Sequence, residues 1–318
     1  MKRIGNRLLG AALVILTMPW STFGDSAQNV IATMPKETNA IIYVNLEKAR
    51  QAAAFVKIKE VFAAERQKMV DQILAKTGVD IDKIKEVWIG GEKKQKGLVL
   101  LKGEFSVETI RQAVALNGEE KVQIVSREGF AFAAVASTPR HGGGPKLGVM
   151  MNDSTIVAGD QSVVDEFLAV AKGEKEGLPA DVVSAAAAFF NETSVVQAFL
   201  VGMPQGALAS NPTLAGVRGG TFVMDLDSGL KASMDILVST EEQAIAYEQI
   251  INGFAGLGKL ASPSDPAKRI INENFLKNLN ISRDGNRITI SLLVGDTDLS
   301  QMIDSVSKVC PSKARPGK

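Results

Sequence analysis

The sequence predicts an α+β fold made of two tandem related halves, with mainly antiparallel sheets covered by helices. Three observations indicate this fold. Short apolar runs follow one another through tight polar turns, helical periodicities lie between these runs, and blocks of sequence recur in the same order. Strands joined by hairpin turns pair antiparallel. Helices interleaved with such hairpins are typical of α+β domains, so we expect the helices to cover one side of the sheet.

The first half is expected to open with a strand over 39–45, where Ile41, Tyr43 and Val44 favour extended structure. A long helix should follow and end at Thr77-Gly78. Its apolar stripe, which we interpret as core, consists of Phe55, Ile58, Phe62, Met69 and Ile73.

The rest of the first half alternates strands with two helices. Ser106 is expected to begin a helix that ends near Leu116, and another helix should run from Ser162 to about Ala171. Polar turns such as Asn152-Asp153-Ser154 join the strands. The expected strands lie at 87–89, 98–101, 122–125, 130–135, 147–151 and 155–157.

The second half repeats this order of elements. Three blocks match, namely Gly97-Leu98 with Gly229-Leu230, Ile124–Gly129 with Asn280–Gly285, and Val157–Asp160 with Val294–Asp296. We interpret them as traces of a duplication, in which 126–135 and 282–293 are equivalent hairpins. The second copy adds a helix between about 266 and 278. The alternative is that the same order of strand, turn, strand and helix recurs by chance, because few residue types form tight turns.

The chain divides into five expected parts. The boundary between the halves should fall in the polar, glycine-containing stretch around 173–179, and the tail carries two prolines and three basic residues. The parts are a signal peptide (1–24), an N-terminal linker (25–37), a first α+β repeat (38–175), a second α+β repeat (176–310) and a disordered basic tail (311–318).

The first residues carry the pattern of a secretory signal peptide. Lys2, Arg3 and Arg7 precede an apolar run over 8–18 that is too short to span a bilayer. Small residues favour cleavage after Gly24. We therefore expect an exported protein, periplasmic or extracellular, with no integral membrane segment after cleavage.

The composition of the mature chain excludes several classes of partner. Removing the signal peptide leaves 33 basic and 35 acidic residues, a formal charge of −2. This balance gives no reason to expect nucleic acid or an anionic membrane as a partner. Trp88 becomes the only tryptophan, so aromatic platforms for single-stranded nucleic acid or sugars are scarce. Cys310 is the only cysteine, which excludes an internal disulfide.

Three segments carry a resemblance to other proteins. They are Asn39–Val44, then Thr77-Gly78-Val79-Asp80, then Gly97–Gly103. In this arrangement the chain is similar to uncharacterised exported bacterial proteins with duplicated α+β halves, each of which opens with an apolar strand and a long helix. The resemblance covers the first half better than the second, and it implies no catalytic residue.

The segment Pro139–Pro145 resembles the oxyanion-hole loop of some lipases, because His141 precedes three glycines. That chemistry also needs a serine on a G-x-S-x-G elbow and a separate histidine as base. The sequence has no such elbow, and His141 is its only histidine, which also excludes a multi-histidine zinc site. We expect an exposed connection. The open alternative is a weak anion site formed by Arg140 and glycine N–H groups.

Other motifs are interpreted as structural. Asp80, Asp82 and the segment Asp225–Gly229 suggest calcium ligands but lack the spacing of an EF-hand loop, and the latter fits a hairpin turn. Asp160 and Asp296 stand where helix N-caps belong.

Two features concern the helix that begins near Ser239-Thr240. The segment Gly253–Gly258 matches neither phosphate-binding pattern and is expected to be a termination loop. The apolar stripe of this helix is interpreted as core, although a groove between the halves would use the same residues. It consists of Ala244, Tyr247, Ile251 and Phe254.

The sequence therefore assigns no catalytic, cofactor-binding or metal-binding residue and implies no cofactor. We expect a non-enzymatic envelope protein that acts by binding a protein or an apolar small molecule. One alternative is a carrier or chaperone for an apolar ligand such as a lipid, and a second is a carboxylate-based hydrolase.

Overall fold

The structure is a computed structural model that describes residues 26–92, 96–116, 122–125, 129–130, 132–136, 145–202, 216–260 and 266–309. The expected signal peptide, the loop of Arg140 and His141, Cys310 and the basic tail lie outside the described residues.

Twelve strands lie in the described parts of the chain. They are β1 (Thr38–Asn45), β2 (Ile84–Glu92), β3 (Gly97–Gly103), β4 (Val122–Val125), β5 (Phe132–Ala136), β6 (Lys146–Asn152), β7 (Thr155–Asp160), β8 (Val196–Leu200), β9 (Val217–Asp225), β10 (Leu230–Val238), β11 (Leu279–Asp284) and β12 (Arg287–Val294).

The helices in the described parts of the chain vary in length from about one turn to more than five turns. They are α2 (Ala27–Ala32), α3 (Leu46–Gln51), α4 (Ala53–Val61), α5 (Ala63–Thr77), the 3₁₀ turn η2 (Ile81–Lys83), α6 (Val107–Leu116), α7 (Gln161–Ala171), α8 (Ala180–Phe189), α10 (Glu241–Leu260), α11 (Pro266–Asn278) and α12 (Asp296–Val309).

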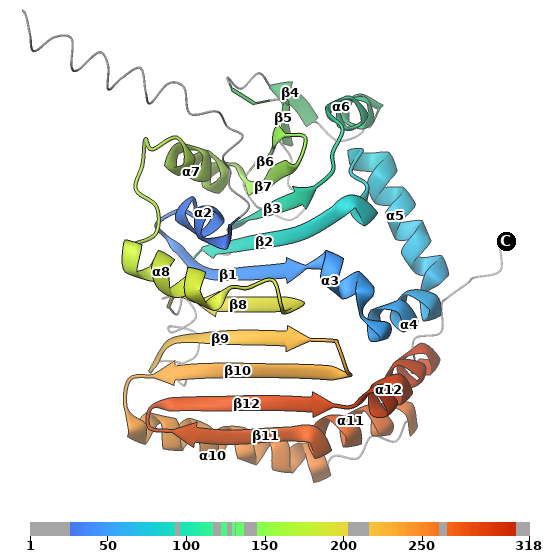
Figure 1. Cartoon of the computed structure of the whole chain (residues 1–318), viewed down its shortest axis with the longest axis vertical. Helices are drawn as coiled ribbons and strands as arrows, with labels where there is room; N and C mark the ends of the chain where they lie inside the picture. Colours follow the sequence, from blue (N-terminus) through green and yellow to red (C-terminus); the bar gives the residue numbers. More distant parts are fainter. Residues whose placement is uncertain are drawn as a thin grey trace, which may run out of the picture.

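The strands form a single sheet in the order β11-β12-β10-β9-β8-β1-β2-β3-β7-β6-β5-β4 (Figure 1). Each neighbouring pair for which a register is described is antiparallel, so the expected α+β class with antiparallel pairing is confirmed. The sequence predicted antiparallel sheets, and the described strands form one continuous sheet instead. β1 pairs with β2 on one side and with β8 on the other, and these hydrogen bonds carry the sheet across the expected boundary.

Helices cover both faces of the sheet, not one side as expected. Figure 1 shows α2, α7 and α8 in front of the strands and α10 behind β11 and β12. We call the face with α2, α7 and α8 the front face. Alternation along a strand explains the two layers, since Leu100 of β3 packs in the front-face core and its neighbour Leu101 packs beside Ile110 of α6 on the back face.

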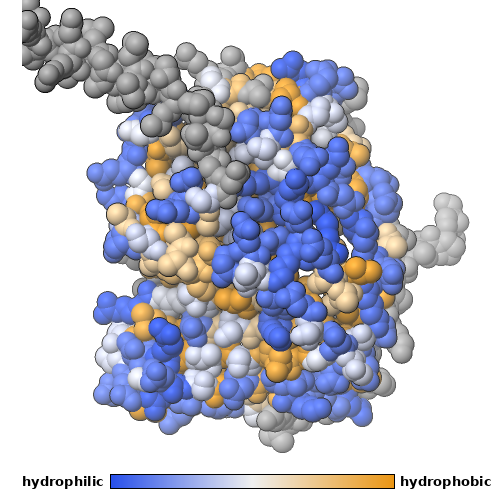
Figure 2. All heavy atoms as spheres, viewed as in Figure 1, coloured by the Kyte–Doolittle hydropathy of each residue, from blue (hydrophilic) through white to orange (hydrophobic). Residues whose placement is uncertain are grey.

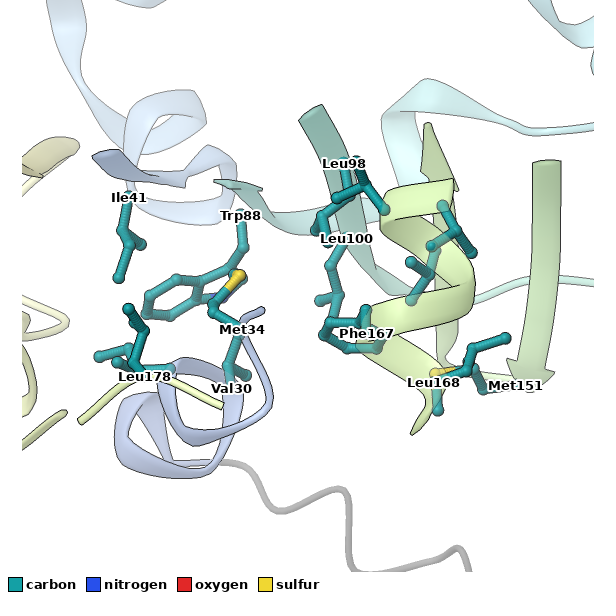
Figure 3. Close-up of a cluster of buried hydrophobic side chains, with 14 of the residues drawn as sticks. Val30, Met34, Ile41, Trp88, Leu98, Leu100, Met151, Phe167, Leu168 and Leu178 are labelled. Atoms are coloured by element: carbon teal, nitrogen blue, oxygen red, sulfur yellow. The ribbon is translucent and has the colours of Figure 1, made fainter. Parts of the chain in front are cut away.

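The front-face core joins the strands of the first half to three helices. Phe167 of α7, Ile41 of β1 and Met34 after α2 are completely buried. Figure 3 shows Trp88 beside Met34 and Ile41 in this cluster. Burial of such side chains stabilises the fold by roughly 1.5–3 kcal/mol each.

The expected N-terminal linker contributes to this core. Val30, Ile31 and Met34 are at most 3% exposed, and they pack against α8 and the strands. The backbone is held as well, because Leu178 N–H donates to Met34 O at 3.2 Å and Pro35 forms a β-bridge with Gly177. The spacing of these three apolar residues is the sequence signal for this helix.

The expected long helix over 46–77 is three helices. Ala52 adopts an extended backbone between α3 and α4, and Phe62 is non-helical between α4 and α5. These breaks rotate the successive segments, so the predicted stripe does not share one buried face. Ile58 is 38% and Met69 50% exposed, which shows that the core interpretation is wrong for both. The predicted end at Thr77-Gly78 is confirmed, with Gly78 at φ 70°.

The expected termination loop at 253–258 lies inside α10, which continues to Leu260. Ala244, Tyr247 and Ile251 pack against the back face as predicted. Phe254 is 71% exposed, so its assignment to the core is wrong.

The hairpin β11–β12 forms as predicted, but its expected equivalence with β4–β5 is wrong. β12 lies beside β10, whereas β4 and β5 lie at the far edge beyond β6. The strand that occupies the matching place beside β3 is β7. The similar turn sequences at 126–129 and 282–285 suggested equivalent hairpins, but the same few turn residues occur in hairpins at different places in a fold.

Among the described residues, no helix combines the length and the apolar character that a membrane crossing requires. Figure 2 shows hydrophilic and hydrophobic side chains intermixed over the front face.

Candidate functional site

A pocket of about 360 Å³ opens at the front face, between the start of α2, the strands β1 and β2, and the end of α8. This volume lies at the lower end of the range of ligand pockets. The lining residues are Ser26, Ala27, Gln28, Tyr43, Glu86, Trp88, Ala187, Phe190, Asn191 and Glu192.

Three buried aromatic rings form the inner wall of the pocket. The antiparallel register of β1 and β2 places Tyr43 opposite Trp88, and their ring centroids lie 4.5 Å apart. Phe190, the first residue after α8, meets Trp88 edge to face at 5.3 Å. Contacts of this kind add to the free energy gained from burial, so they hold the wall rigid.

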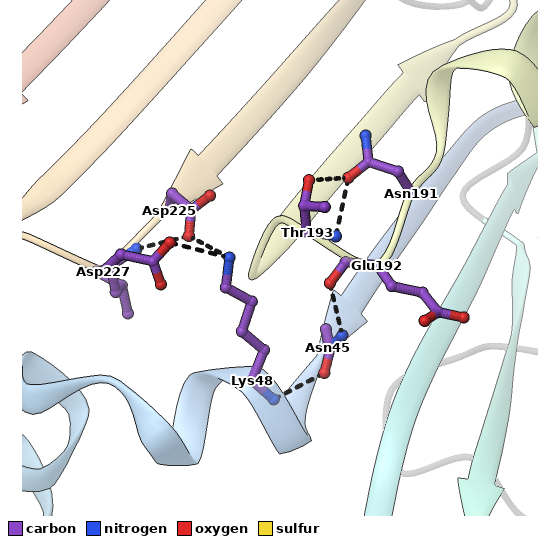
Figure 4. Close-up of polar contacts among 8 residues, drawn as sticks. Asn45, Lys48, Asn191, Glu192, Thr193, Asp225 and Asp227 are labelled. Atoms are coloured by element: carbon purple, nitrogen blue, oxygen red, sulfur yellow. Dashed lines mark hydrogen bonds and ion pairs between the residues drawn. The ribbon is translucent and has the colours of Figure 1, made fainter.

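Two carboxylates line the same pocket. Glu86 lies two residues before Trp88 on the same side of β2, and its Oε2 accepts a hydrogen bond from Trp88 Nε1 at 3.2 Å. Lys102 Nζ lies 4.0 Å from the same oxygen. Glu192 is exposed in the loop after α8, where Asn45 Nδ2 donates to its backbone oxygen at 3.3 Å (Figure 4).

The environment keeps Tyr43 protonated. Burial raises the pKa of its hydroxyl well above the usual value, and the negative charges of Glu86 and Glu192 raise it further, while a hydrogen bond with Asn45 opposes them. The hydroxyl is therefore neutral at physiological pH, and the titratable lining groups that carry charge are carboxylates.

A buried amide positions the loop that carries Glu192. Gln197 of β8 lies opposite Tyr43 and is completely buried. Its Oε1 accepts the backbone N–H of Asn191 at 2.9 Å, and Asn191 Oδ1 accepts the N–H of Thr193 at 2.9 Å. These bonds fix the loop at the mouth of the pocket. Gln197 Nε2 has no hydrogen-bond partner within the described parts of the chain.

A second pocket of about 340 Å³ lies at the start of α7 and is lined by Lys96, Pro145, Asp160, Gln161, Ser162 and Asp165. Asp160 occupies the N-cap position as predicted, but its carboxylate does not cap the helix. It accepts Lys146 Nζ at 2.6 Å and Gly97 N–H at 3.0 Å. Burial alone would raise the pKa of Asp160, but these two hydrogen bonds outweigh it and lower the pKa.

The other predicted aspartate cap is displaced by one residue. Asp296 is the first residue of α12, and Gly295 O accepts the first helical hydrogen bond, from Leu299 N–H. Its carboxylate is placed to interact favourably with the positive end of the helix dipole.

The predicted hairpin turn is confirmed between β9 and β10; Asp225 is the last residue of β9 and Asp227 lies in the turn. Lys48 of α3 reaches both carboxylates, at 3.0 and 3.2 Å (Figure 4). Burial lowers the pKa of Lys48, but the hydrogen bonds to the two aspartates overcome this and leave the pKa raised. The cluster is therefore a clamp between α3 and the second half of the sheet.

The remaining aspartates that suggested calcium have structural contacts. Asp80 caps η2 by accepting Asp82 N–H at 2.9 Å, and Asp82 pairs with Arg66. In the parts of the chain that the structure describes, no group of three or more histidine, cysteine, aspartate or glutamate side chains is placed to hold a metal ion.

Sequence reasoning missed the first pocket. Its members come from four distant segments, and none of them forms a local motif. The available signal was the alternation of β1 and β2, which places Tyr43 and Trp88 on the face that α8 covers. The register that brings them side by side depends on long-range pairing, which a single sequence does not reveal.

Comparison with known proteins finds structural likeness only. The sequence matches no protein-family model and no curated protein. Crystal forms I, III and IV of TP0453 match 88%, 87% and 91% of this chain and 97–98% of their own, with TM-scores of 0.44, 0.46 and 0.47. Sequence identity is 9–10%, which is too low to transfer a function.

Proposed function

We propose that the mature chain is an exported, non-enzymatic envelope protein, periplasmic or extracellular, that binds a ligand in the pocket between α2 and α8. The observation that carries this proposal is a preformed pocket with an aromatic inner wall and two carboxylates. Ligand sites characteristically combine a largely apolar wall with a few placed polar groups. Gln197 holds the loop that carries Asn191 and Glu192, which supports a site whose geometry exists before the ligand arrives.

The proposal includes tandem related halves. The strand order β1-β2-β3-β7-β6 in the first half parallels β8-β9-β10-β12-β11 in the second. In each half a helical segment separates the third strand from the later hairpin, and a helix follows the last strand. The hairpin β4–β5 is then an addition to the first copy, and the pocket lies beside the junction of β1 and β8.

A carboxylate-based hydrolase is the second candidate, because Glu86 and Glu192 line one pocket. Such an enzyme needs one carboxyl group kept protonated as a general acid. Glu86 Oε2 already accepts the indole N–H of Trp88 and lies 4.0 Å from Lys102 Nζ, so two donors engage this oxygen. The contacts therefore suit binding better than proton transfer. A carrier of a purely apolar ligand is less favoured, since carboxylates stand at the pocket.

Native mass spectrometry tests the proposed function. The protein is purified from the envelope of the cell that produces it, together with two variants of exposed residues in α2. Gln28 lines the pocket and its neighbour Asn29 does not. We expect a bound small molecule on the wild type and on Asn29→Trp, and its loss from Gln28→Trp, where the indole fills the mouth.

Three results would contradict the proposal. They are wild-type protein without a small molecule, an adduct that survives in Gln28→Trp, or recovery of a chemically cleaved ligand after long incubation with the pure protein. The last result would favour the hydrolase. A lipid that is displaced by Gln28→Trp would favour the carrier.

A further inference from the structure

We propose that the pocket between α2 and α8 takes an organic cation, with an alkylated ammonium group seated against the aromatic wall. This inference rests on the proposed function and names the ligand class of the same site.

The first argument is charge. Of the ten lining residues, the two that are charged at neutral pH are Glu86 and Glu192, and none is lysine or arginine. Lys102 contacts Glu86 from outside the lining at 4.0 Å, beyond the distance of a strong charge-assisted hydrogen bond. The exposed Glu192 has no ion pair among the described residues. A cation in the pocket would therefore meet negative charge that is only partly compensated.

The second argument is the helix that forms one side. Ala187 lies in the last turn of α8 and Phe190 directly follows the helix, so the carboxyl end of α8 borders the pocket. The carbonyl groups of a last helical turn carry a partial negative charge. One of them, Phe189 O, accepts Asn191 Nδ2 at 3.3 Å. The helix end thus adds to the attraction for a cation and opposes an anion.

The third argument separates an organic cation from a metal ion. Hard metal ions need several oxygen ligands in a shell, whereas three of the lining side chains are aromatic. Aromatic rings attract cations through the negative face of the ring, best over tryptophan, within about 6 Å of the centroid. Tyr43, Trp88 and Phe190 are at most 5% exposed, so only small parts of the three rings border the pocket, and a cation there would meet these parts together with the two carboxylates. The pocket of about 360 Å³ is far larger than a bare metal ion and has room for an alkylated ammonium group.

The test uses choline and its uncharged isostere 3,3-dimethylbutan-1-ol as probes of the mature protein. Trp88 is then the only tryptophan, so its fluorescence reports on the pocket directly. We expect choline to change the emission of Trp88 in a saturable way, and to bind at least tenfold more tightly than the neutral probe. The affinity should fall as salt is raised, because charge contributes to it.

Variants that replace a carboxylate by an amide test which glutamates attract choline. Glu86→Gln and Glu192→Gln should each weaken choline binding several-fold and leave the weak binding of the neutral probe unchanged. Glu174→Gln, an exposed carboxylate between α7 and α8 outside the lining, is the matched control and should bind like the wild type. Thermal unfolding of each variant verifies that it is folded.

Two outcomes overturn the inference and leave the proposed function standing. They are equal affinity for both probes, and choline binding that neither glutamate variant weakens, provided that a native ligand is still displaced by Gln28→Trp. A wild-type protein and an Asn29→Trp variant that both carry no ligand would instead defeat the proposed function itself. A separate experiment measures binding of the protein to phosphatidylcholine vesicles. If the protein binds the vesicles and free choline abolishes this binding, the cation belongs to a lipid headgroup.

Discussion

At the scale of single residues, Asp160 occupies a helix N-cap position but its carboxylate has partners outside the helix. The residue stands at the start of α7, where an aspartate commonly caps the helix. Its carboxylate instead joins Gly97 of β3 to Lys146 of β6, on either side of its own strand. It therefore ties three neighbouring strands together at one end of the sheet.

These contacts of Asp160 should make the stability of the fold depend on pH. Because the folded state lowers the pKa of Asp160, its contribution to stability is present above the ordinary aspartate pKa and is lost as the pH falls through the folded value. Asp160→Asn should cost about 1–3 kcal/mol at pH 7. Urea unfolding at pH 7 and pH 3 measures the change.

The cost should begin to shrink at pH 3, because the pH is then below the ordinary aspartate pKa and the carboxylate of the unfolded chain is mostly protonated. Asp153→Asn, an exposed aspartate in the turn between β6 and β7, is the control and should be nearly neutral at both values. An equal penalty for Asp160→Asn at both pH values would show that the charge of this residue is not what stabilises the fold.

At the scale of elements, sequence periodicity predicted most strands but missed β8, and it predicted one long helix poorly. The β-branched and aromatic run around Ile41 and Tyr43 marked β1, and Gly229 at φ 100° marked the turn before β10. The breaks at Ala52 and Phe62 carry no proline or glycine. They arise because α3 to α5 must wrap around the end of the sheet, a tertiary demand that local propensity does not encode.

The clamp formed by Lys48 tests how elements of the two halves are joined. Lys48→Met keeps the apolar stem but leaves the half-buried Asp225 without its cation. We expect a loss of about 1–2 kcal/mol, between the values for exposed and buried pairs. Chemical denaturation at neutral pH measures the loss.

Lys59→Met is the matched control, because Lys59 is an exposed lysine of α4 without a described salt bridge. It should change stability by less than about 0.5 kcal/mol. If both variants behave alike, the clamp does not contribute to the connection between α3 and the β9–β10 turn.

At the scale of the whole molecule, one sheet unites what the sequence divided into two repeats. β1 is central, since it pairs with β2 of its own half and β8 of the other. The order of strands and the pocket beside β1 both follow from these pairings, and pairing depends on residues far apart in sequence. This is why the class of the fold was predictable and the site was not.

Ile41 tests the cooperativity of this sheet. It is completely buried in β1, so Ile41→Ala should cost about 2–5 kcal/mol and leave a single unfolding transition, because the halves share the strand. Ile58→Ala, at an isoleucine that is 38% exposed in α4, should cost less than about 1 kcal/mol. Calorimetry measures both. Two separate transitions in Ile41→Ala would show that the halves unfold as independent domains.

A crystal structure of the mature protein grown with choline tests the central claim most directly. We predict the ammonium group between α2 and α8, within about 6 Å of the ring centroid of Tyr43, Trp88 or Phe190 and facing Glu86 or Glu192. An empty pocket at saturating choline, or an ammonium bound elsewhere on the surface, would contradict the account.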